Sequence, residues 1–118
     1  MRFLCQVWFD GTILDRMSPT EKAALDRDSL AYDAKLQRDG SFIAAEALQS
    51  PSSAVTVKVR SGRMATTDGP FIETKEHLGG FILIEAKDME AAVTIAAGIP
   101  LAKYGSIEVR PIYEIPGA

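Results

Sequence analysis

The sequence predicts one α+β domain, spanning residues 1–118, in which two helices cover one face of an antiparallel β-sheet. Three observations support this fold class. The expected elements follow the order strand, helix, strands, strand, helix, strand, which is typical of such a layered fold. The length of 118 residues suffices for one hydrophobic core and leaves no room for a second domain. The composition, 47% hydrophobic and 25% charged, is that of a globular protein.

The first expected strand covers Arg2–Asp10, which is rich in aromatic and β-branched residues. Gly11–Met17 is expected to be a loop. Cys5, the only cysteine, lies within this strand, so no internal disulfide can form. We expect it to be a buried, unreactive small hydrophobe, because no base or cation near it in the sequence would lower its pKa.

A long helix is predicted from Pro19 to about Asp39. Ser18 is placed to cap it, and Glu21 completes a capping box. Gly40 is expected to end it as a left-handed cap. The residues that recur at helical spacing are Leu25, Ser29, Tyr32 and Leu36. Of these, the leucines and the tyrosine are expected to face the sheet.

The middle of the chain reads as three strands. Ser41–Leu48 is the first, and a loop follows it. Val55–Arg60 alternates valine with polar residues, which predicts a half-buried strand. Ser61-Gly62 is typical of a tight turn, so Arg63–Thr67 is expected to fold back as a hairpin.

The last third of the chain predicts a strand, a helix and a strand. The strand is Gly80–Ala86, and Asp88 caps a short helix that is stopped by a glycine and a proline. The helix residues expected to share a face are Met89, Val93 and Ala96. Ser106–Ile115 is the final strand, and Pro111 within it predicts an edge, a bulge or the end of the strand.

Together these elements predict a ferredoxin-like βαββαβ arrangement with an extra hairpin. Two helices can cover only one face of the sheet. Strand segments such as Phe81–Ile84 and Phe42–Ala45 carry apolar groups on both sides, so the other face must also be buried. We therefore expect a homodimer in which two sheets pack around a two-fold axis as a dimeric α+β barrel.

The charge distribution excludes some function classes. The net charge is −3, and the basic residues are scattered, which argues against direct binding of nucleic acid. No apolar run approaches the roughly 18 residues needed to span a membrane. The apolar stretch at the N-terminus is short and interrupted by Gln6, unlike a signal peptide. A cytoplasmic protein is expected.

The segment Asp68–Phe71, followed by Glu73–Phe81, is the most specific string in the chain. It resembles the signature of the DGPF branch of the YCII-related family, and the resemblance extends to the closing strand at Gly105–Pro111. The resemblance implies a dimeric α+β barrel. It does not imply a function, because the family is mostly biochemically uncharacterised. We refer below to residues 68–81 as the signature segment.

Asp68 is the acid of the signature segment and has two interpretations. Its side chain could cap the turn through Gly69 and Pro70. It could instead project into a cavity as a base or ligand anchor. An Asp68→Asn variant separates these interpretations, since asparagine keeps most of the hydrogen bonding and loses the charge.

His77 and Arg110 are further candidates. His77 is the only histidine and is either a loop anchor or a proton carrier at a cavity mouth. With no other histidine or cysteine near it, no metal site with the usual ligands is expected. No glycine-rich phosphate loop or other cofactor motif is present, so no cofactor is expected. Arg110 is either solvated or ion-paired, or it clamps an anion.

This sequence differs from the typical YCII-related pattern at two positions. YCII-related proteins typically carry a histidine in the first helix and an aspartate near the end of the second, a pair that suggests an acid–base dyad. These positions fall on Ser29 and Ile99 in this sequence. Neither side chain can replace its counterpart, so the dyad chemistry is not expected here.

Two function classes remain at this stage. The first is a small-molecule-binding homodimer, with or without weak enzymatic activity based on Asp68. The second is a non-catalytic regulatory module with a protein partner, linked to transcription initiation because DGPF domains occur fused to sigma factors. A cavity lined by Asp68, Ser29 and Tyr32 would favour the first class, and a filled core with a flat apolar patch the second. The missing dyad favours binding over catalysis.

Overall fold

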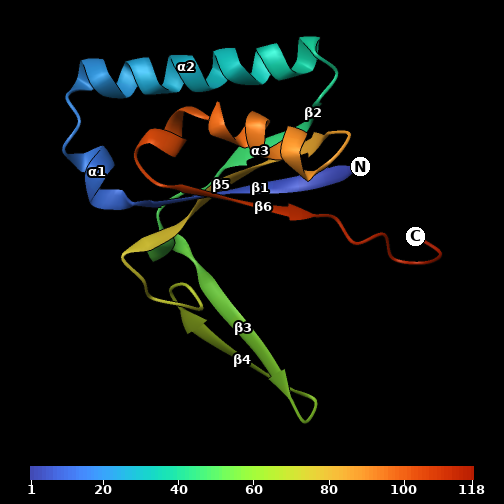
Figure 1. The fold of residues 1–118 in the computed structure, drawn as a ribbon. Coiled ribbons are helices and arrows are strands. Elements are labelled where there is room, and N and C mark those ends of the chain that lie inside the picture. Colours follow the sequence, from blue (N-terminus) through green and yellow to red (C-terminus); the bar gives the residue numbers. More distant parts are fainter.

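The computed structural model describes residues 1–118 and consists of a four-stranded antiparallel sheet, two helices over one of its faces, and a separate hairpin (Figure 1). The sheet strands in their spatial order are β2 (Phe42–Ala47), β5 (Glu76–Glu85), β1 (Arg2–Asp10) and β6 (Ser106–Pro111). The hairpin strands are β3 (Val55–Arg60) and β4 (Arg63–Asp68). The helical elements are α1 (Gly11–Asp15), α2 (Pro19–Arg38), η1 (Pro51–Ser53), α3 (Met89–Ala97) and η2 (Pro100–Lys103).

The topology confirms the ferredoxin-like prediction. Without the hairpin, the chain runs β1-α2-β2-β5-α3-β6, and the first strand lies between the third and the last in the sheet. All of the strand pairs in the sheet are antiparallel. The hairpin is inserted between β2 and β5.

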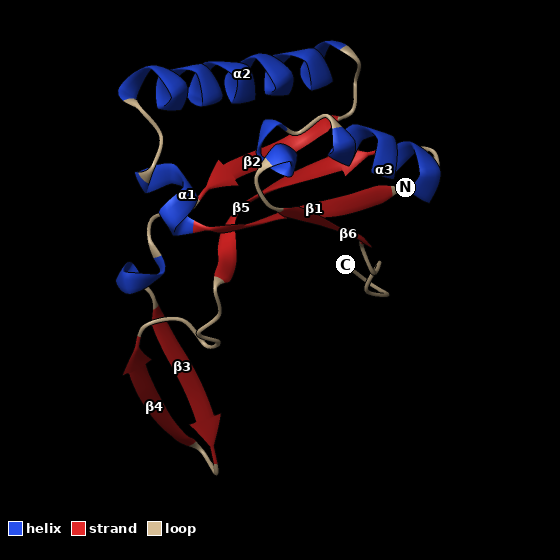
Figure 2. Ribbon diagram, turned by 60° about the vertical axis from the view of Figure 1, so that its left-hand side comes forward, coloured by secondary structure: helices blue, strands red, loops and turns tan.

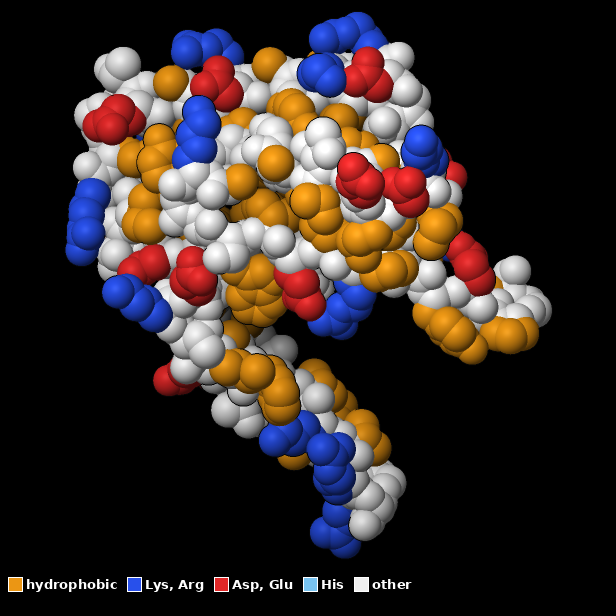
Figure 3. All heavy atoms as spheres, viewed as in Figure 1, with side chains coloured by type: hydrophobic (Ala, Val, Ile, Leu, Met, Phe, Trp, Pro, Cys, Tyr) orange, Lys and Arg blue, Asp and Glu red, His pale blue; other side chains and the backbone are white.

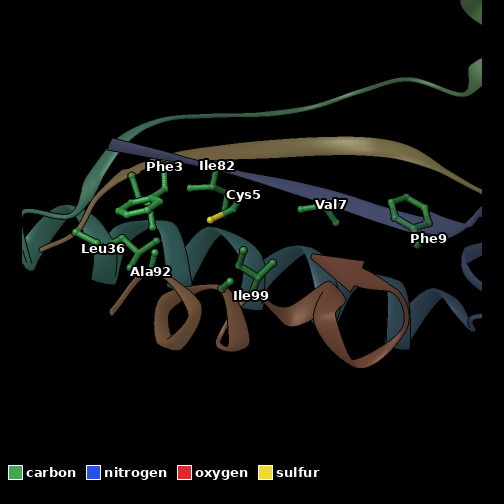
Figure 4. Packing of buried hydrophobic residues seen from close by; sticks show 11 residues of the cluster. Phe3, Cys5, Val7, Phe9, Leu36, Ile82, Ala92 and Ile99 are labelled. Atoms are coloured by element: carbon green, nitrogen blue, oxygen red, sulfur yellow. The ribbon is translucent and has the colours of Figure 1, made fainter. Parts of the chain in front are cut away.

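The hydrophobic core lies between the sheet and the two helices (Figure 4). Side chains of β1 alternate between the two faces of the sheet, and the buried ones are Phe3, Cys5, Val7 and Phe9. Cys5 is completely buried, as predicted. Desolvation raises the pKa of its thiol to about 11, which keeps it protonated.

The predicted capping box of α2 is confirmed. Ser18 Oγ accepts a hydrogen bond from the Glu21 backbone N–H at 3.1 Å. Glu21 Oε1 accepts one from the Ser18 backbone N–H, also at 3.1 Å. Pro19 occupies the first helical position, and Gly40 follows the helix with a φ of +78°. The local sequence therefore defines both ends of this helix.

The prediction of a loop over Gly11–Met17 is wrong, because α1 forms there. Asp10 caps this helix by accepting hydrogen bonds from the backbone N–H of Thr12 at 3.0 Å and from its hydroxyl at 2.9 Å. The backbone hydrogen bond is also the main cause of the lowered pKa of Asp10. A helix of five residues is too short to give a periodic pattern, so only its cap could have indicated it.

The three α3 residues that were expected to share a face, Met89, Val93 and Ala96, differ in burial. Met89 and Val93 are exposed, whereas Ala92 and Ala96 are buried. Small alanines let the helix approach the sheet closely, and Ile95 also packs against the core. The Asp88 cap is confirmed by a hydrogen bond of 2.9 Å from the Ala91 backbone N–H.

The strand limits differ slightly from the predicted ones. β5 begins at Glu76, four residues before the predicted start, so the end of the signature segment belongs to the sheet. β6 ends at Pro111 rather than Ile115 and is an edge strand, which agrees with both the edge and the end predicted for that proline.

The β3–β4 hairpin, called the arm below, projects from the body of the molecule (Figure 2). Its turn is the predicted one, with φ of +52° at Ser61 and +73° at Gly62. The expectation that β3 is half-buried is wrong, since Val57 is 57% exposed and its neighbouring valines are exposed to the same degree. Alternation indicates that valines share a face, but nothing in this chain covers that face.

None of the helices has the length and apolar content that a membrane crossing requires.

Candidate ligand cleft

A cleft of about 580 Å³ lies where the arm leaves the sheet. Its walls come from the sheet, the loop before the arm and the signature segment. The apolar residues that line it are Trp8, Leu48, Ala54, Phe71, Ile72 and Leu78. His77 is the only titratable residue in the lining, and the remaining lining residues are serines, prolines and one glutamine. The cleft is therefore mostly apolar, and one imidazole side chain is among its lining residues.

Sheet pairing places Trp8 and Leu78 together. They are directly opposite each other in the β1–β5 ladder, just after an irregularity in the register between Val7 and Trp8. Because Val7 and Phe9 point into the core, Trp8 points to the face remote from the helices. That face forms one wall of the cleft.

Two hydrogen bonds hold the start of the signature segment against the base of the arm. The Gly69 N–H donates to the Ala54 carbonyl at 2.7 Å, and the Thr56 hydroxyl donates to the Gly69 carbonyl at 2.9 Å. Gly69 has a φ of +98°, a conformation that glycine adopts without strain. The chain then turns so that Pro70 and Phe71 line the cleft.

The glycine pair of the signature segment makes room for neighbouring groups. A Cβ at position 79 would lie 2.0 Å from the Phe9 ring, and one at position 80 would lie 2.7 Å from the Glu46 carbonyl oxygen. The absence of a side chain at Gly79 thus lets the Phe9 ring lie against β5, and the absence of one at Gly80 lets β2 approach β5 closely. Both glycines support the sheet beside the cleft.

His77 is directly opposite Phe9 in the β1–β5 ladder, so its ring lies on the Phe9 side of the sheet, at the edge of the cleft that it lines. Its ring centroid is 5.1 Å from that of Phe9, with the planes tilted by 57°. Nδ1 is 3.4 Å from the Leu78 carbonyl oxygen, and Nε2 lies on the side of Gly11, where a Cβ would come within 3.0 Å of it. The side chain is half-buried. Among the residues predicted from the sequence, it is the one that the structure places in this cleft.

Asp68 lies elsewhere. It ends β4, pairs with Val55 in the hairpin and is exposed. Its carboxylate makes no hydrogen bond, so the expected capping of the Gly69–Pro70 turn does not form in this structure. It also does not line the cleft. The apolar residues that follow it, rather than the acid itself, bring the signature segment into the cleft.

Ser29 and Tyr32 lie on α2, on the other side of the sheet (Figure 1). The Tyr32 hydroxyl donates to the Ile95 carbonyl at 2.6 Å, and desolvation raises the pKa of Tyr32. Gly98 leaves space for its ring, since a Cβ there would lie 2.4 Å from the hydroxyl oxygen. A single cavity that combines these residues with Asp68 is therefore not formed. Ile99 is a core residue, 5% exposed.

Tyr32 instead lines a shallow groove of about 370 Å³ beside η2, with Lys35, Arg38 and Lys103. Lys35 is already bound to Asp39 at 2.8 Å. Arg110 is also partnered, by Glu108 at 2.5 Å, and is exposed on the sheet face remote from the helices. The structure thus does not bring Arg110 together with the other candidates.

Sequence reasoning missed most of the cleft residues. Trp8 was assigned only to a strand, and Leu48 and Phe71 were not considered as site residues. The available signals were that Trp8 is the only tryptophan of the chain and that an apolar Phe71-Ile72 pair interrupts a polar segment. Neither signal shows that the two segments meet, since more than 60 residues separate them.

Comparison with known proteins agrees with this fold. Residues 1–116 match the YCII-related domain. This chain belongs to the YCII-related family. A relative from Rhizobium meliloti (strain 1021), called "Uncharacterized protein R00369", is 32% identical over 105 residues, which cover 87% of this chain and 85% of the relative. The relative's name gives no activity to compare.

A solved structure of similar fold is the 5-chloro-2-hydroxyhydroquinone dehydrochlorinase TftG from Burkholderia phenoliruptrix AC1100, in complex with 2,5-dihydroxybenzoquinone. The TM-score is 0.56 with 16% sequence identity, and the alignment covers 96% of this YCII-related domain and 94% of TftG. At this identity the similarity establishes the fold and no residue role.

Proposed function

We propose that this YCII-related domain binds a small, mostly apolar molecule with one polar group in the cleft beside the signature segment. The observation that carries the proposal is the cleft of about 580 Å³ with a single titratable residue, His77. Its volume is within the range of roughly 300–1,000 Å³ that ligand pockets occupy. Its apolar lining matches the usual pattern, in which few polar groups orient the ligand.

The side chains suggest how such a ligand is held. Trp8 and Phe71 offer aromatic surface to a ring from two different segments. His77 is the group that can donate to or accept from a hydroxyl or carbonyl at the same site. The fold agrees with this ligand class, since the structural neighbour TftG is complexed with a dihydroxybenzoquinone.

The proposed function is ligand binding, without the acid–base chemistry of a histidine–aspartate dyad. Ser29 and Ile99 occupy the positions at which the family typically has its histidine and aspartate, and Ile99 is buried among core residues. Asp68 is exposed and outside the lining of the cleft, so it adds no support for an enzyme built on that residue. Membership of the DGPF branch and a cytoplasmic location are parts of the proposal that rest on the sequence.

A homodimer is the proposed working form. Leu4 pairs with Leu83, and Phe81 lies beside them on the sheet face that no helix covers. Glu46 and Arg110 add charge at the margins of this face. Packing of two such faces would bury the apolar strip and produce the expected barrel.

The binding proposal is tested by following the indole N–H of Trp8 in two-dimensional ¹H–¹⁵N NMR spectra. Trp8 is the only tryptophan, so its side chain gives a single reporter in the cleft. Addition of 2-naphthol, a ring with one hydroxyl, is expected to shift this signal saturably. The expected Kd is on the order of 1 mM, as for a fragment that gains about 4 kcal/mol.

Two matched variants sharpen the test. Leu48→Asp places a charge at the cleft and is expected to weaken binding at least tenfold. Leu30→Asp changes an exposed leucine on α2, outside the cleft, and is expected to leave binding unchanged. An unshifted Trp8 signal in the folded wild-type protein, or equal binding by both variants, would refute the proposal.

A second candidate function is a protein-interaction module linked to transcription initiation. The observation that favours it is the exposed apolar surface of the arm, where Val55, Val59 and Met64 are 58%, 58% and 70% exposed. It predicts no saturable binding of 2-naphthol and a purified sigma factor as partner. Titrating 2-naphthol and the purified sigma factor separately into samples of the same protein preparation distinguishes the two functions.

A further inference from the structure

The arm has one apolar face that nothing in the chain covers. Its cross-strand pairing aligns Val57 with Thr66 and Val59 with Met64, so these side chains share a face. The side chains on the opposite face include Lys58, Arg60 and Arg63. A two-stranded hairpin is only marginally stable by itself in water, because it buries too little apolar surface. The ordered arm therefore requires a surface on which to pack.

The dimensions of the chain show that this surface is missing from the monomer. Its radius of gyration is 16.3 Å, whereas a compact chain of this length is expected to have about 13.5 Å. Its accessible surface is 8266 Å², compared with about 6,300 Å² expected for a compact monomer of 12.8 kDa. The excess of about 2,000 Å² is larger than the roughly 800 Å² that each partner buries in a standard interface.

The net charge of the arm differs in sign from that of the rest of the chain. The arm, residues 55–68, contains three basic side chains and one acidic one, a formal net charge of +2. The whole chain carries −3, so the rest of the chain carries −5. Figure 3 shows the basic side chains gathered toward the tip of the arm, with acidic ones distributed over the body. These basic side chains lie on the face opposite the valines, so they attract the arm to an acidic body only at long range, and the contact of the valine face itself is apolar.

We propose that each arm packs its valine face on the body of a second copy of this chain, so that two arms are exchanged around a two-fold axis. A second copy carries a body of opposite net charge, and the exchange buries the valine face and the excess area of both chains. This contact is additional to ligand binding and to the contact between the two sheet faces. It assigns a role to the hairpin, which the ferredoxin-like arrangement does not require.

The test compares two aspartate variants of the arm by light scattering and small-angle X-ray scattering. The wild-type protein is expected to have twice the chain mass of 12.8 kDa at micromolar concentration. Val57→Asp places a charge on the valine face and is expected to raise the dimer dissociation constant at least tenfold. Ala65→Asp, which lies opposite Lys58 on the other face, is expected to leave the constant within about twofold.

A second pair of measurements covers the case in which Val57→Asp does not fold. Val59→Thr keeps a β-branched side chain and removes a methyl group from the valine face, so it is expected to fold and to weaken the dimer at least threefold. Three results would overturn the proposal. The first is a monomeric wild-type protein. The second is a monomer with a radius of gyration near 13.5 Å, which would show that the arm folds back on its own body. The third is a dimer that neither arm variant weakens. The last result would leave a dimer formed by the sheet faces alone. None of these three results changes the expected binding of 2-naphthol in the cleft, which is measured separately through Trp8.

Discussion

Gly79 shows most directly how a single residue of the signature segment determines the structure beside the cleft. An added methyl group would overlap the Phe9 ring, which is 7% exposed and cannot move outward without opening the core. We predict that Gly79→Ala lowers the free energy of unfolding by about 1–3 kcal/mol through this overpacking. In a Phe9→Leu background the same substitution is expected to cost less, because the ring is gone. Equal costs in both backgrounds, measured by urea denaturation, would show that the contact with Phe9 is not the reason for this glycine.

Cys5 provides a prediction of pH dependence. Its pKa is raised from 9.0 to about 11 by burial, so the unfolded chain releases the thiol proton at lower pH than the folded chain does. Stability that is fully present below pH 9 is therefore lost as the pH rises toward 11. Between pH 8 and pH 10 the wild type is expected to lose about 1 kcal/mol more than Cys5→Ala, as measured by urea denaturation. Parallel pH profiles for the two proteins would contradict the burial of this thiol.

The sequence predicted the burial of single residues better than it predicted which residues line the cleft. The burial of Cys5 follows from a local pattern, so the sequence sufficed for it. Asp68 was favoured because it is the acid in a recognisable turn, yet the structure exposes it and directs Phe71 to the cleft instead. Whether a side chain lines a cavity depends on segments distant in the sequence, here β1 and the loop before the arm. That information is not present around Asp68.

At the scale of elements, a complete capping motif in the sequence was sufficient to predict where a helix begins. The Ser18 capping box includes both reciprocal hydrogen bonds and fixes the start of α2. We predict that Ser18→Ala lowers the free energy of unfolding by about 1 kcal/mol, since a backbone N–H at the helix start loses its acceptor. Thr20→Ala, an exposed change in the same turn, is the control and is expected to have a smaller effect. Equal unfolding midpoints for wild type and Ser18→Ala in thermal denaturation would be the contrary result.

Elements that depend on tertiary contacts were predicted less well. α3 was placed correctly by its Asp88 cap, but of the three residues expected to share a face only Ala96 is buried, whereas Met89 and Val93 are exposed. Helical spacing does not show which side of a helix packs on the sheet, and close packing there favours small residues. The valine alternation of β3 correctly predicted a strand, and it could not show that the strand lies on an arm outside the core.

At the scale of the whole molecule, the ferredoxin-like topology, the cleft and the arm have related causes. Insertion of the arm between β2 and β5 creates a junction at which the signature segment, the preceding loop and the sheet meet. The cleft is located at this junction, and its lining is apolar because it continues the sheet face that no helix covers. The sequence predicted the topology and the extra hairpin, but not that the insertion forms a cavity.

The most direct test of binding in this cleft is a crystal structure of the protein soaked with 2-naphthol. The account predicts electron density for one ring against Trp8 and Phe71, with the hydroxyl within hydrogen-bonding distance of His77. Full occupancy requires a soak well above the expected Kd of about 1 mM. A cleft that is empty at this concentration, or that is closed by Phe71 or by the arm of a second copy, would contradict the account.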